Sequence, residues 1–569
     1  MTKTLEEYTK DELIEVIKGL KRRKKFGLVW EDKPEEVVRL CDTELPVLEE
    51  VTNRAIDKVK DAPTNLIIEG DNYHSLSVLN YTHTGKIDVI YIDPPYNTGG
   101  SGFRYDDKIL DSTDQYRHSK WLSFMGKRLE LAKSLLSRKG IIFISIDENE
   151  AARLKLLCDE VFSAENYITT ITVQVNKGGR DYLPIAVTHE YILCYAKSSD
   201  AKINELEKEV GSLKQSDKDG KYELRELRNR NPRFNRANRP NLYYPIYVNP
   251  DSKNTSNECA VSLTKSDVFS VEALPKNSKG DDSCWRWGKP LLEKNITQVP
   301  DTSQVVARQK RDGGWNIYEK SREATSKAKS IWDETEVRTE QGTIDLRKLG
   351  MGGLFDHPKP VYLIKKCLKL ATDKNSLVLD YMAGSGTTGQ SLLELNKEDG
   401  GNRRFILCTN NENQIAEKVT YERISRVISG SGESEPIPAN VRYFKTSLVS
   451  KQQTNDQTRI ELVARSTEMI CLREDTFEKV IDTKMFKVFG NADHYAAIVF
   501  EPEAIVLLKD ALTKLKDDKA IHIYIFSLSN DTYESDFADL ERTHELRPIP
   551  ESILEVYRRI HKSQSEGVL

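Results

Sequence analysis

The sequence lacks the signals of several protein classes. It has no apolar run near the roughly 20 residues that cross a bilayer, and its N-terminus has no apolar core typical of a signal peptide. The eight cysteines form no CxxC pair and have no histidine at zinc spacing, which argues against a structural metal and for a reducing compartment. We therefore expect a cytoplasmic protein with no metal site and no membrane contact.

The chain also lacks a strong charge of either sign. The formal net charge is −4 over 569 residues, with 38% hydrophobic and 31% charged residues. This composition is typical of a globular protein, and the length predicts roughly three or four domains. Total charge gives no indication of nucleic-acid binding, so any DNA-binding surface has to be a local basic patch.

The most informative stretch is a short strand that ends at two prolines. Residues 87–92 form an apolar run suited to a buried parallel strand, and Asp93-Pro94-Pro95-Tyr96 follows. In an open α/β sheet, ligands bind at the carboxyl ends of the strands. The Asp93 carboxylate and the Pro94 carbonyl can accept both protons of an amino group, and the Tyr96 ring can stack on a base. The stretch predicts a socket for a flipped nucleobase; the alternative is an ordinary Pro-Pro turn.

Further short apolar runs alternate with helical patterns on both sides of this stretch. They predict strands at residues 65–70, 141–146, 168–175, 190–195, 376–380 and 404–408. This alternation indicates an α/β protein with a doubly wound parallel sheet and helices on both faces.

A glycine-rich loop follows the predicted strand at 376–380 and leads into a helix. It comprises Asp380, Tyr381, Met382, Ala383, Gly384, Ser385, Gly386, Thr387, Thr388 and Gly389. A phosphate-binding P-loop would need a lysine after Gly386, which is absent. The spacing of Gly384, Gly386 and Gly389 fits a dinucleotide fingerprint, but the next strand ends in Thr409 and Asn410 instead of an acidic residue.

Between about 198 and 345 the α/β pattern stops, and basic residues alternate with aromatic ones. The candidates for DNA contacts are Arg225, Arg228, Arg230, Arg233, Arg236, Arg239, Trp285, Arg286 and Trp287. Such residues suit phosphate and base contacts. The equally weighted alternative is a solvated domain whose aromatic residues form its own small core.

We predict five parts in the chain. They are a helical N-terminal appendage (1–60), the catalytic half of the core (61–197), a target recognition domain (198–350), the cofactor-binding half of the core (351–432) and a small α/β assembly domain (433–569). Within the last part, strands are expected at 458–464, 494–500 and 520–526, and helices at about 503–516 and 549–561.

The two motifs together resemble the beta class of amino-methylating DNA methyltransferases, and the long flanking segments resemble the modification subunit of type III restriction-modification systems. The resemblance implies a Rossmann-like methyltransferase sheet and S-adenosylmethionine as cofactor. It further implies duplex DNA as substrate, a homodimer and a restriction helicase-nuclease partner. Asp93, Pro94, Pro95 and Tyr96 would then be catalytic. The cofactor would be bound by Asp71, His357, Lys359, Asp380, Ala383, Gly384, Ser385, Gly386 and Thr387. The ribose-binding residue stays open, because the nearest acidic side chain after 404–408 is Glu412.

The resemblance predicts methylation of adenine N6, because relatives that act on cytosine N4 more often carry serine at the position of Asp93. Cytosine-N4 methylation stays an alternative, as does a non-catalytic DNA-binding subunit with the same fold. A protein-glutamine methyltransferase and a nicotinamide-dependent oxidoreductase are weaker rivals. Methylation at carbon 5 of cytosine is excluded, because no cysteine lies beside the two prolines.

Overall fold

The computed structural model describes residues 30–31, 33–60, 62–99, 104–105, 108–109, 114–179, 184–208, 213–451, 454–528, 531 and 533–567. The chain forms two compact units: Met1–Asn204 with Lys329–Leu569, and Glu205–Ala328. Residues 1–29 of the predicted N-terminal appendage lie outside the described residues. Among the described residues, no helix combines the length and the apolarity needed to cross a membrane.

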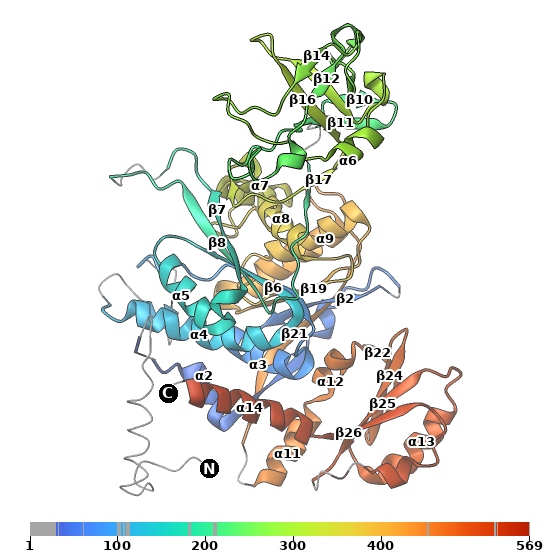
Figure 1. Cartoon of the computed structure of the whole chain (residues 1–569). Helices are drawn as coiled ribbons and strands as arrows, with labels where there is room; N and C mark the ends of the chain where they lie inside the picture. The colour runs from blue at the N-terminus through green and yellow to red at the C-terminus, as the bar shows by residue number, and fades with distance from the viewer. Residues whose placement is uncertain are drawn as a thin grey trace, which may run out of the picture. The chain divides into compact units, whose positions relative to one another are not determined.

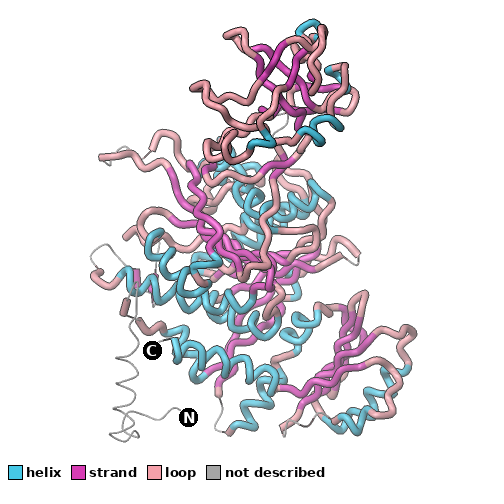
Figure 2. Tube along the Cα trace, viewed as in Figure 1, coloured by secondary structure: helices cyan, strands magenta, loops and turns pink. Residues whose placement is uncertain are grey.

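A ten-stranded sheet is the centre of the first unit (Figures 1 and 2). In spatial order its strands are β1 (Glu44–Glu50), β21 (Asn440–Ser450), β2 (Thr64–Glu69), β20 (Arg404–Thr409), β19 (Leu377–Asp380), β3 (Ile87–Ile92), β6 (Leu136–Ile146), β8 (His189–Ala196), β7 (Tyr167–Gln174) and β18 (Ile331–Trp332). All neighbours from β21 to β6 are parallel, whereas β1 and β8 run antiparallel to the strands beside them. The predicted α/β fold and the predicted strands of the core are confirmed, but the prediction of a wholly parallel sheet is wrong, because β1 and β8 are antiparallel to their neighbours.

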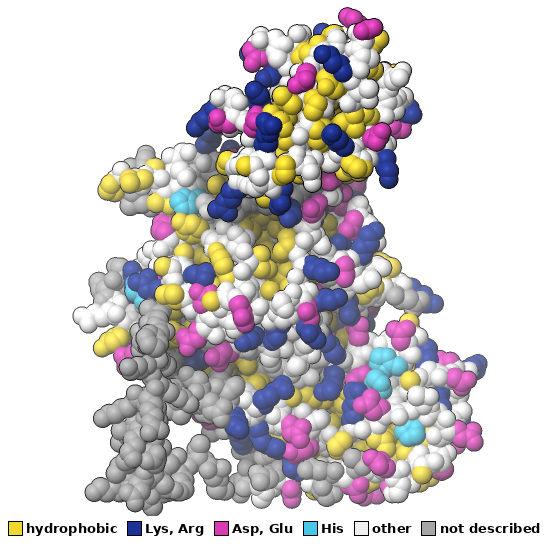
Figure 3. Space-filling view, viewed as in Figure 1, with side chains coloured by type: hydrophobic (Ala, Val, Ile, Leu, Met, Phe, Trp, Pro, Cys, Tyr) yellow, Lys and Arg dark blue, Asp and Glu magenta, His cyan; other side chains and the backbone are white. Residues whose placement is uncertain are grey.

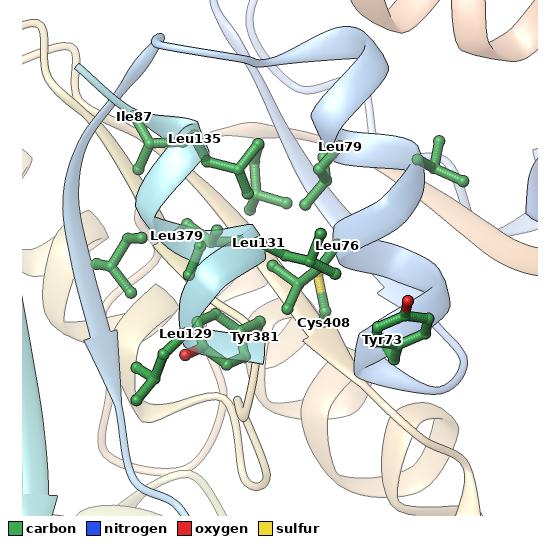
Figure 4. Close-up of a cluster of buried hydrophobic side chains, with 14 of the residues drawn as sticks. Tyr73, Leu76, Leu79, Ile87, Leu129, Leu131, Leu135, Leu379, Tyr381 and Cys408 are labelled. Carbon is green, nitrogen blue, oxygen red and sulfur yellow. The ribbon is translucent and has the colours of Figure 1, made fainter. Parts of the chain in front are cut away.

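Helices cover both faces of this sheet because the central strands carry apolar side chains on both sides. One face packs against α3 (Asn72–Thr82), α4 (Arg117–Leu135) and α5 (Ala151–Phe162), and Figure 4 shows part of that cluster, including Leu76, Leu135 and Leu379. On the other face, Gly389 of α9 (Thr387–Asp399) lies so close to Leu407 that an added Cβ would be 3.0 Å from its Cδ1. The other helices near that face are α8 (Val361–Ala371) and α10 (Glu422–Ser429).

The boundaries of the outer parts differ from the prediction. Residues 44–50 are not part of a helical appendage: they form β1, an edge strand of the main sheet. Residues 440–450, assigned to the separate C-terminal domain, form β21 beside it. Residues 329–350 contribute β18 and α7 (Thr339–Lys348) to the first unit. Long-range strand pairing decides these placements, and local pattern does not reveal it.

The C-terminal part has its own sheet, in the order β22 (Glu478–Asp482), β23 (Phe486–Gly490), β24 (His494–Val499), β25 (Ala520–Phe526) and β26 (His544–Ile549). It is accompanied by α11 (Asn455–Ala464), α12 (Thr467–Glu474), α13 (Ile505–Thr513) and α14 (Glu551–Gly567). The prediction of a strand at 458–464 is wrong, because this segment is α11. Its β-branched and apolar residues bury one side of a helix there.

The second unit is a small β-rich domain. It contains a four-stranded sheet of β10 (Gln215–Asp217), β11 (Gly220–Glu226), β16 (Trp315–Ser321) and β15 (Val305–Gln309). A three-stranded sheet consists of β13 (Val261–Ser262), β12 (Ile246–Val248) and β14 (Val271–Ala273). Its apolar core includes Leu227, Tyr244 and Trp285.

Candidate active site

The two sequence motifs lie on neighbouring strands. β19 pairs with β3 in parallel, with Val378 opposite Val89. Asp93 therefore follows the carboxyl end of β3, and Asp380 ends β19 at the same edge of the sheet. Parallel strands present their carboxyl ends together, so the amine-binding motif and the glycine-rich loop face a common region.

A cavity of about 840 Å³ opens at Asp93-Pro94-Pro95-Tyr96. It is lined by residues that follow β3, β6 and β7, by the start of β8 and by the segment 339–359, all within the first unit. Five of the lining residues are acidic: Asp93, Asp147, Glu190, Glu340 and Asp356. Such a cavity attracts positively charged groups and repels phosphates. A nucleobase carries no negative charge and is not repelled from the cavity, whereas the sugar-phosphate backbone attached to it is better placed outside.

Lys359 connects the carboxylates at the base of this cavity. Its Nζ lies 3.2 Å from Asp93 Oδ1 and 2.9 Å from Glu190 Oε2, and it donates a hydrogen bond of 2.5 Å to the Tyr96 hydroxyl. The Tyr96 hydroxyl in turn donates to Glu190 Oε2 at 3.0 Å. Lys359 was predicted to bind the cofactor; in the structure its ammonium contacts Asp93 and Glu190, and a cofactor contact stays a prediction. Lys359 lies two residues before α8, in a segment that reaches Asp93 at the carboxyl end of β3.

Burial and charge act in opposite directions in this cluster. Burial raises the pKa of Asp93 above its usual range, and the Lys359 ammonium partly opposes that shift. Burial alone would lower the pKa of Lys359, but Asp93 and Glu190 hold it above its usual range. Nearby, burial raises the pKa of Asp147 to about 6. Lys359 therefore stays protonated and favours the ionised, hydrogen-bond-accepting form of Asp93.

Glu190 was not identified from the sequence as a functional residue. It lies near the start of β8 within the run His-Glu-Tyr-Ile-Leu-Cys-Tyr-Ala, and the only local signal is a carboxylate among apolar strand residues. Its role depends on a contact with Lys359, which is 169 positions away in the chain. Local pattern cannot reveal such a partnership.

Hydrogen bonds hold the proline motif in place. The Trp121 indole of α4 donates to the Pro95 carbonyl at 2.7 Å. Asn97, two residues later, donates to the buried Glu150 at 2.5 Å, and His118 contacts the same carboxylate oxygen at 2.5 Å. These contacts anchor both ends of the turn, so Tyr96 is presented to the cavity from a rigid support.

The glycine-rich loop fits the expected methyl donor through its backbone. Gly384 and Gly386 have φ values of +47° and +76°, which side-chain-bearing residues rarely adopt. The buried Asp380 accepts from the Met382 N–H at 3.0 Å and from the Thr388 hydroxyl at 2.5 Å, and burial raises its pKa to about 7. Asp380 thus ties the loop to the start of α9, where the helix N-terminus leaves backbone donors for a ligand.

The side chains of Ser385 and Thr387, predicted to bind the cofactor, are engaged inside the protein. The fully buried Arg423 of α10 donates to the Ser385 hydroxyl at 3.1 Å and to the Thr387 hydroxyl at 2.6 Å. Any ligand contact from these two residues therefore falls to their backbone. Nothing in the local sequence around Arg423 indicated this support.

The remaining cofactor candidates surround the same strand ends. Asp71 follows β2 and caps α3 by accepting from the Tyr73 N–H at 2.7 Å. His357 lines the cavity, as does Phe355. A Cβ at Gly384 would lie 3.4 Å from the Phe355 ring, so Phe355 borders both the cavity and the loop. Ala383 is buried beside the loop.

In the second unit, the predicted DNA-contacting residues separate into two groups. The prediction for Trp285 is wrong: its ring is buried in the core, and its N–H donates to the Tyr244 carbonyl at 2.7 Å. Arg286 is paired with Glu319 at 2.7 Å. Trp287 packs against the core, and Arg228 is bonded to Glu226. Aromatic and basic residues of a small domain often serve its own core.

The exposed basic residues gather on one loop. Arg233, Arg236 and Arg239 are exposed within residues 231–239, and Arg230 just before them is 77% exposed. Arg225 of β11 is also exposed, with a long contact of 3.8 Å to Glu319. Figure 3 shows basic side chains distributed over the visible face of this unit. The DNA contacts of these five arginines stay a prediction.

Comparison with known proteins agrees with this site. A family model described as a DNA methylase matches residues 87–420. The Mod subunit of the type III restriction-modification enzyme EcoPI of Escherichia phage P1 is 33% identical over 71% of this chain and 67% of its own length. The type II methyltransferase M.KpnI of Klebsiella pneumoniae is 32% identical over 64% of this chain and 86% of its own length. The StyLTI Mod subunit of Salmonella typhimurium is 32% identical over 67% of this chain and 59% of its own length.

The matched region runs from the first residue of β3 to the helix that follows β20, so it includes both motifs and everything between them. It covers more than half of the chain. The chain belongs to the DNA methylase family.

Proposed function

We propose that this DNA methylase methylates N6 of adenine in duplex DNA, as the modification subunit of a type III restriction-modification system. The observation that carries the proposal is the Asp93 carboxylate at a cavity beside Tyr96, next to the glycine-rich loop. Asp93, in place of serine, favours adenine over cytosine. The Mod descriptions of the EcoPI and StyLTI relatives support the system type.

S-adenosylmethionine, the methyl donor of this family, supplies an activated methyl group beside a sulfonium. It would be held by Gly384, Gly386 and the start of α9. Asp71 and Asp380 would line the site at the carboxyl ends of β2 and β19. The acidic residues of the cavity favour the positive charge of the sulfonium. Together these groups would hold the methyl donor next to the carboxyl end of β3.

The residues of the proline motif act on the base. Tyr96 stacks on the flipped adenine, which offsets part of the few kcal/mol that the base gives up on leaving the helix. Asp93 and the Pro94 carbonyl accept hydrogen bonds from the amino group and turn its lone pair toward the methyl carbon. The amine displaces Lys359 from Asp93 Oδ1, and Lys359 keeps its contact with Glu190. The nitrogen would take the methyl group as the methyl–sulfur bond breaks, which leaves a neutral thioether. Asp93, which faces the nitrogen, would accept the proton that the nitrogen loses.

Labelled-methyl transfer tests the proposal. We expect the chain, given methyl-labelled S-adenosylmethionine and mixed-sequence DNA, to place the label in N6-methyladenine after hydrolysis of the DNA to nucleosides. Label in N4-methylcytosine would overturn the choice of base. Binding of DNA without transfer, under conditions where the cofactor binds, would indicate a non-catalytic specificity subunit.

The second unit is proposed as the target recognition domain, and the exposed loop 231–239 as a phosphate-binding surface. We expect Arg233→Ala with Arg236→Ala and Arg239→Ala to weaken DNA binding at all sequences. The slope of log K against log salt should fall by about one for each phosphate group that the variant no longer neutralises. Fluorescence anisotropy over a salt series measures it. Lys221 is exposed on the hairpin of β10 and β11, and the variant Lys221→Ala is the control. Equal slopes in the parent and the triple variant would show that the loop is not part of the DNA interface.

The homodimer and the restriction helicase-nuclease partner are proposed on the same basis as the system type. The C-terminal sheet is proposed as an assembly domain for them. Light scattering of the purified chain would detect the dimer, and a monomer at micromolar concentration would contradict it.

A further inference from the structure

Two histidines and a glutamate meet on the C-terminal sheet, far along the chain from both motifs. Glu474 ends α12, His494 begins β24, and His522 lies on β25. One possible ligand atom from each residue lies within 4.8 Å of the other two. The parallel pairing of β24 with β25 puts Ala496 opposite His522, so both histidines project from one face, the face that packs on α12.

We infer that this cluster is a site for a divalent transition-metal ion of the zinc type. Two neutral imidazoles and one carboxylate are donors that Zn²⁺, Co²⁺ and Ni²⁺ prefer, whereas Mg²⁺ and Ca²⁺ prefer oxygen alone. Glu474 Oε2 lies 2.5 Å from His522 Nδ1 and 3.3 Å from His494 Nε2. Three protein ligands leave at least one position for water.

The buried Nε2 of His494, which makes no hydrogen bond within the described part of the chain and has only the 3.3 Å contact with Glu474 Oε2, indicates a ligand. Buried polar atoms without partners are rare in folded proteins. A metal ion held between Nε2, His522 Nδ1 and Glu474 Oε2 would satisfy this nitrogen.

The residues around the three ligands orient them as supporting partners do in metal sites. Tyr524 and Arg547 donate to the other oxygen of Glu474, Oε1, at 2.5 and 2.6 Å, so Oε2 is left toward the histidines. Glu545 Oε2 lies 3.8 Å from His522 Nε2, the ring nitrogen opposite to the proposed ligand atom. A carboxylate there favours the tautomer that leaves Nδ1 available to a metal.

The local charges permit a cation. Arg547 is paired with Glu545 as well as Glu474, and Arg473 lies 3.9 Å from Glu474 Oε1. The two carboxylates thus balance the two guanidinium groups, and the Lys86 ammonium donates to the Arg473 carbonyl at 3.0 Å. The histidine side chains are 21% and 27% exposed, which leaves the ion a path from solvent. Figure 3 shows histidine side chains at the surface of this part of the molecule.

The sequence predicted no metal, because the three ligands are separated by 20 and 28 positions and match no zinc spacing. Strand pairing and the packing of α12 bring them together. A bound ion would tie the last turn of α12 to two strands, and so stabilise the C-terminal sheet without entering the methyl-transfer site.

Metal titration of the full, untagged chain tests the inference. After dialysis against a chelator, we expect Co²⁺ to bind at one ion per chain with visible d–d absorption, and Zn²⁺ to displace it. Zn²⁺ should raise the thermal midpoint of unfolding. Binding should weaken as pH falls through the range in which histidine takes up a proton, because the ligand atoms must be unprotonated.

Single-histidine variants provide the decisive comparison. His494→Ala and His522→Ala should each lower Co²⁺ affinity by more than the about 10–100-fold that loss of a supporting partner costs, and should abolish the Zn²⁺ effect on the thermal midpoint. His544→Ala, in the same sheet but outside the cluster, should bind like the parent. Circular dichroism confirms that each variant is folded before titration. Absence of binding in the parent, or unchanged affinity in folded His494→Ala, would overturn the inference.

Discussion

Asp93→Ala should reduce methyl transfer by about 100- to 1000-fold or more, the scale on which loss of one positioned group that stabilises developing charge slows an enzyme. The substitution removes the acceptor that turns the amine toward the methyl donor. Asp93 belongs neither to the loop 231–239 nor to the glycine-rich loop in the sequence, so affinity for DNA and for S-adenosylmethionine should stay close to that of the parent. Single-turnover transfer of labelled methyl measures the loss.

Two further variants sharpen this result. Asp93→Asn keeps one acceptor oxygen but loses the charge that pairs with Lys359, and should fall between the parent and Asp93→Ala. Glu398→Ala removes a carboxylate outside the cavity, where it pairs with Lys365, and should transfer methyl at the parental rate. Activity retained in Asp93→Ala would contradict the catalytic role. Joint loss of transfer, DNA binding and cofactor binding would instead indicate a misfolded variant.

Lys359→Met should move the acidic limb of the pH–rate profile upward by about 1–3 pH units, the usual effect of an opposite charge at this distance. Burial already raises the pKa of Asp93, and Lys359 is the group that lowers it. Without Lys359, the carboxylate becomes protonated at higher pH. Because the ionised form accepts the amino protons, transfer should fall at pH values where the parent is still active, and should be regained as pH rises.

Glu190→Gln should shift the same limb in the opposite direction. The Glu190 carboxylate raises the pKa of Asp93, so its neutralisation lowers that pKa and extends activity to lower pH. Lys365→Met is the matched control, because Lys365 pairs with Glu394 and Glu398 outside the cavity. Rates over a pH series at saturating cofactor measure all three. Shifts of the same sign in Lys359→Met and Glu190→Gln would refute the electrostatic account.

The sequence predicted methyl transfer because both motifs are contiguous stretches of chain. Asp93 to Tyr96 combine a strand end, two prolines and an aromatic ring within four residues, and Asp380 to Gly389 combine a strand end, glycines and a helix start. Each motif needs only backbone geometry that its own residues impose. Strand alternation then predicted the sheet that brings them to one edge, because buried parallel strands are recognisable by composition alone.

The basic-aromatic segment shows where local pattern stops being informative. Trp285 and Arg233 were equal candidates in the sequence, yet one lies in the core and the other is exposed. Burial depends on which strands pair, and the same residue types serve a small core as well as a DNA surface. The prediction of a strand at 458–464 was wrong for a related reason, because a short apolar run suits either a strand or a helix, and here it forms α11.

By itself, the sequence determined the fold class, the two motifs and their order, and therefore methyl transfer to an amine. Only the tertiary structure decided that Lys359 and Glu190 shift the pKa of Asp93. It also decided that Arg423 supports the glycine-rich loop. It brought Glu474, His494 and His522 into one cluster. Each of these contacts joins residues dozens to hundreds of positions apart. Their chemistry arises from proximity and low dielectric in the folded state, and neither property is present in a local stretch of chain.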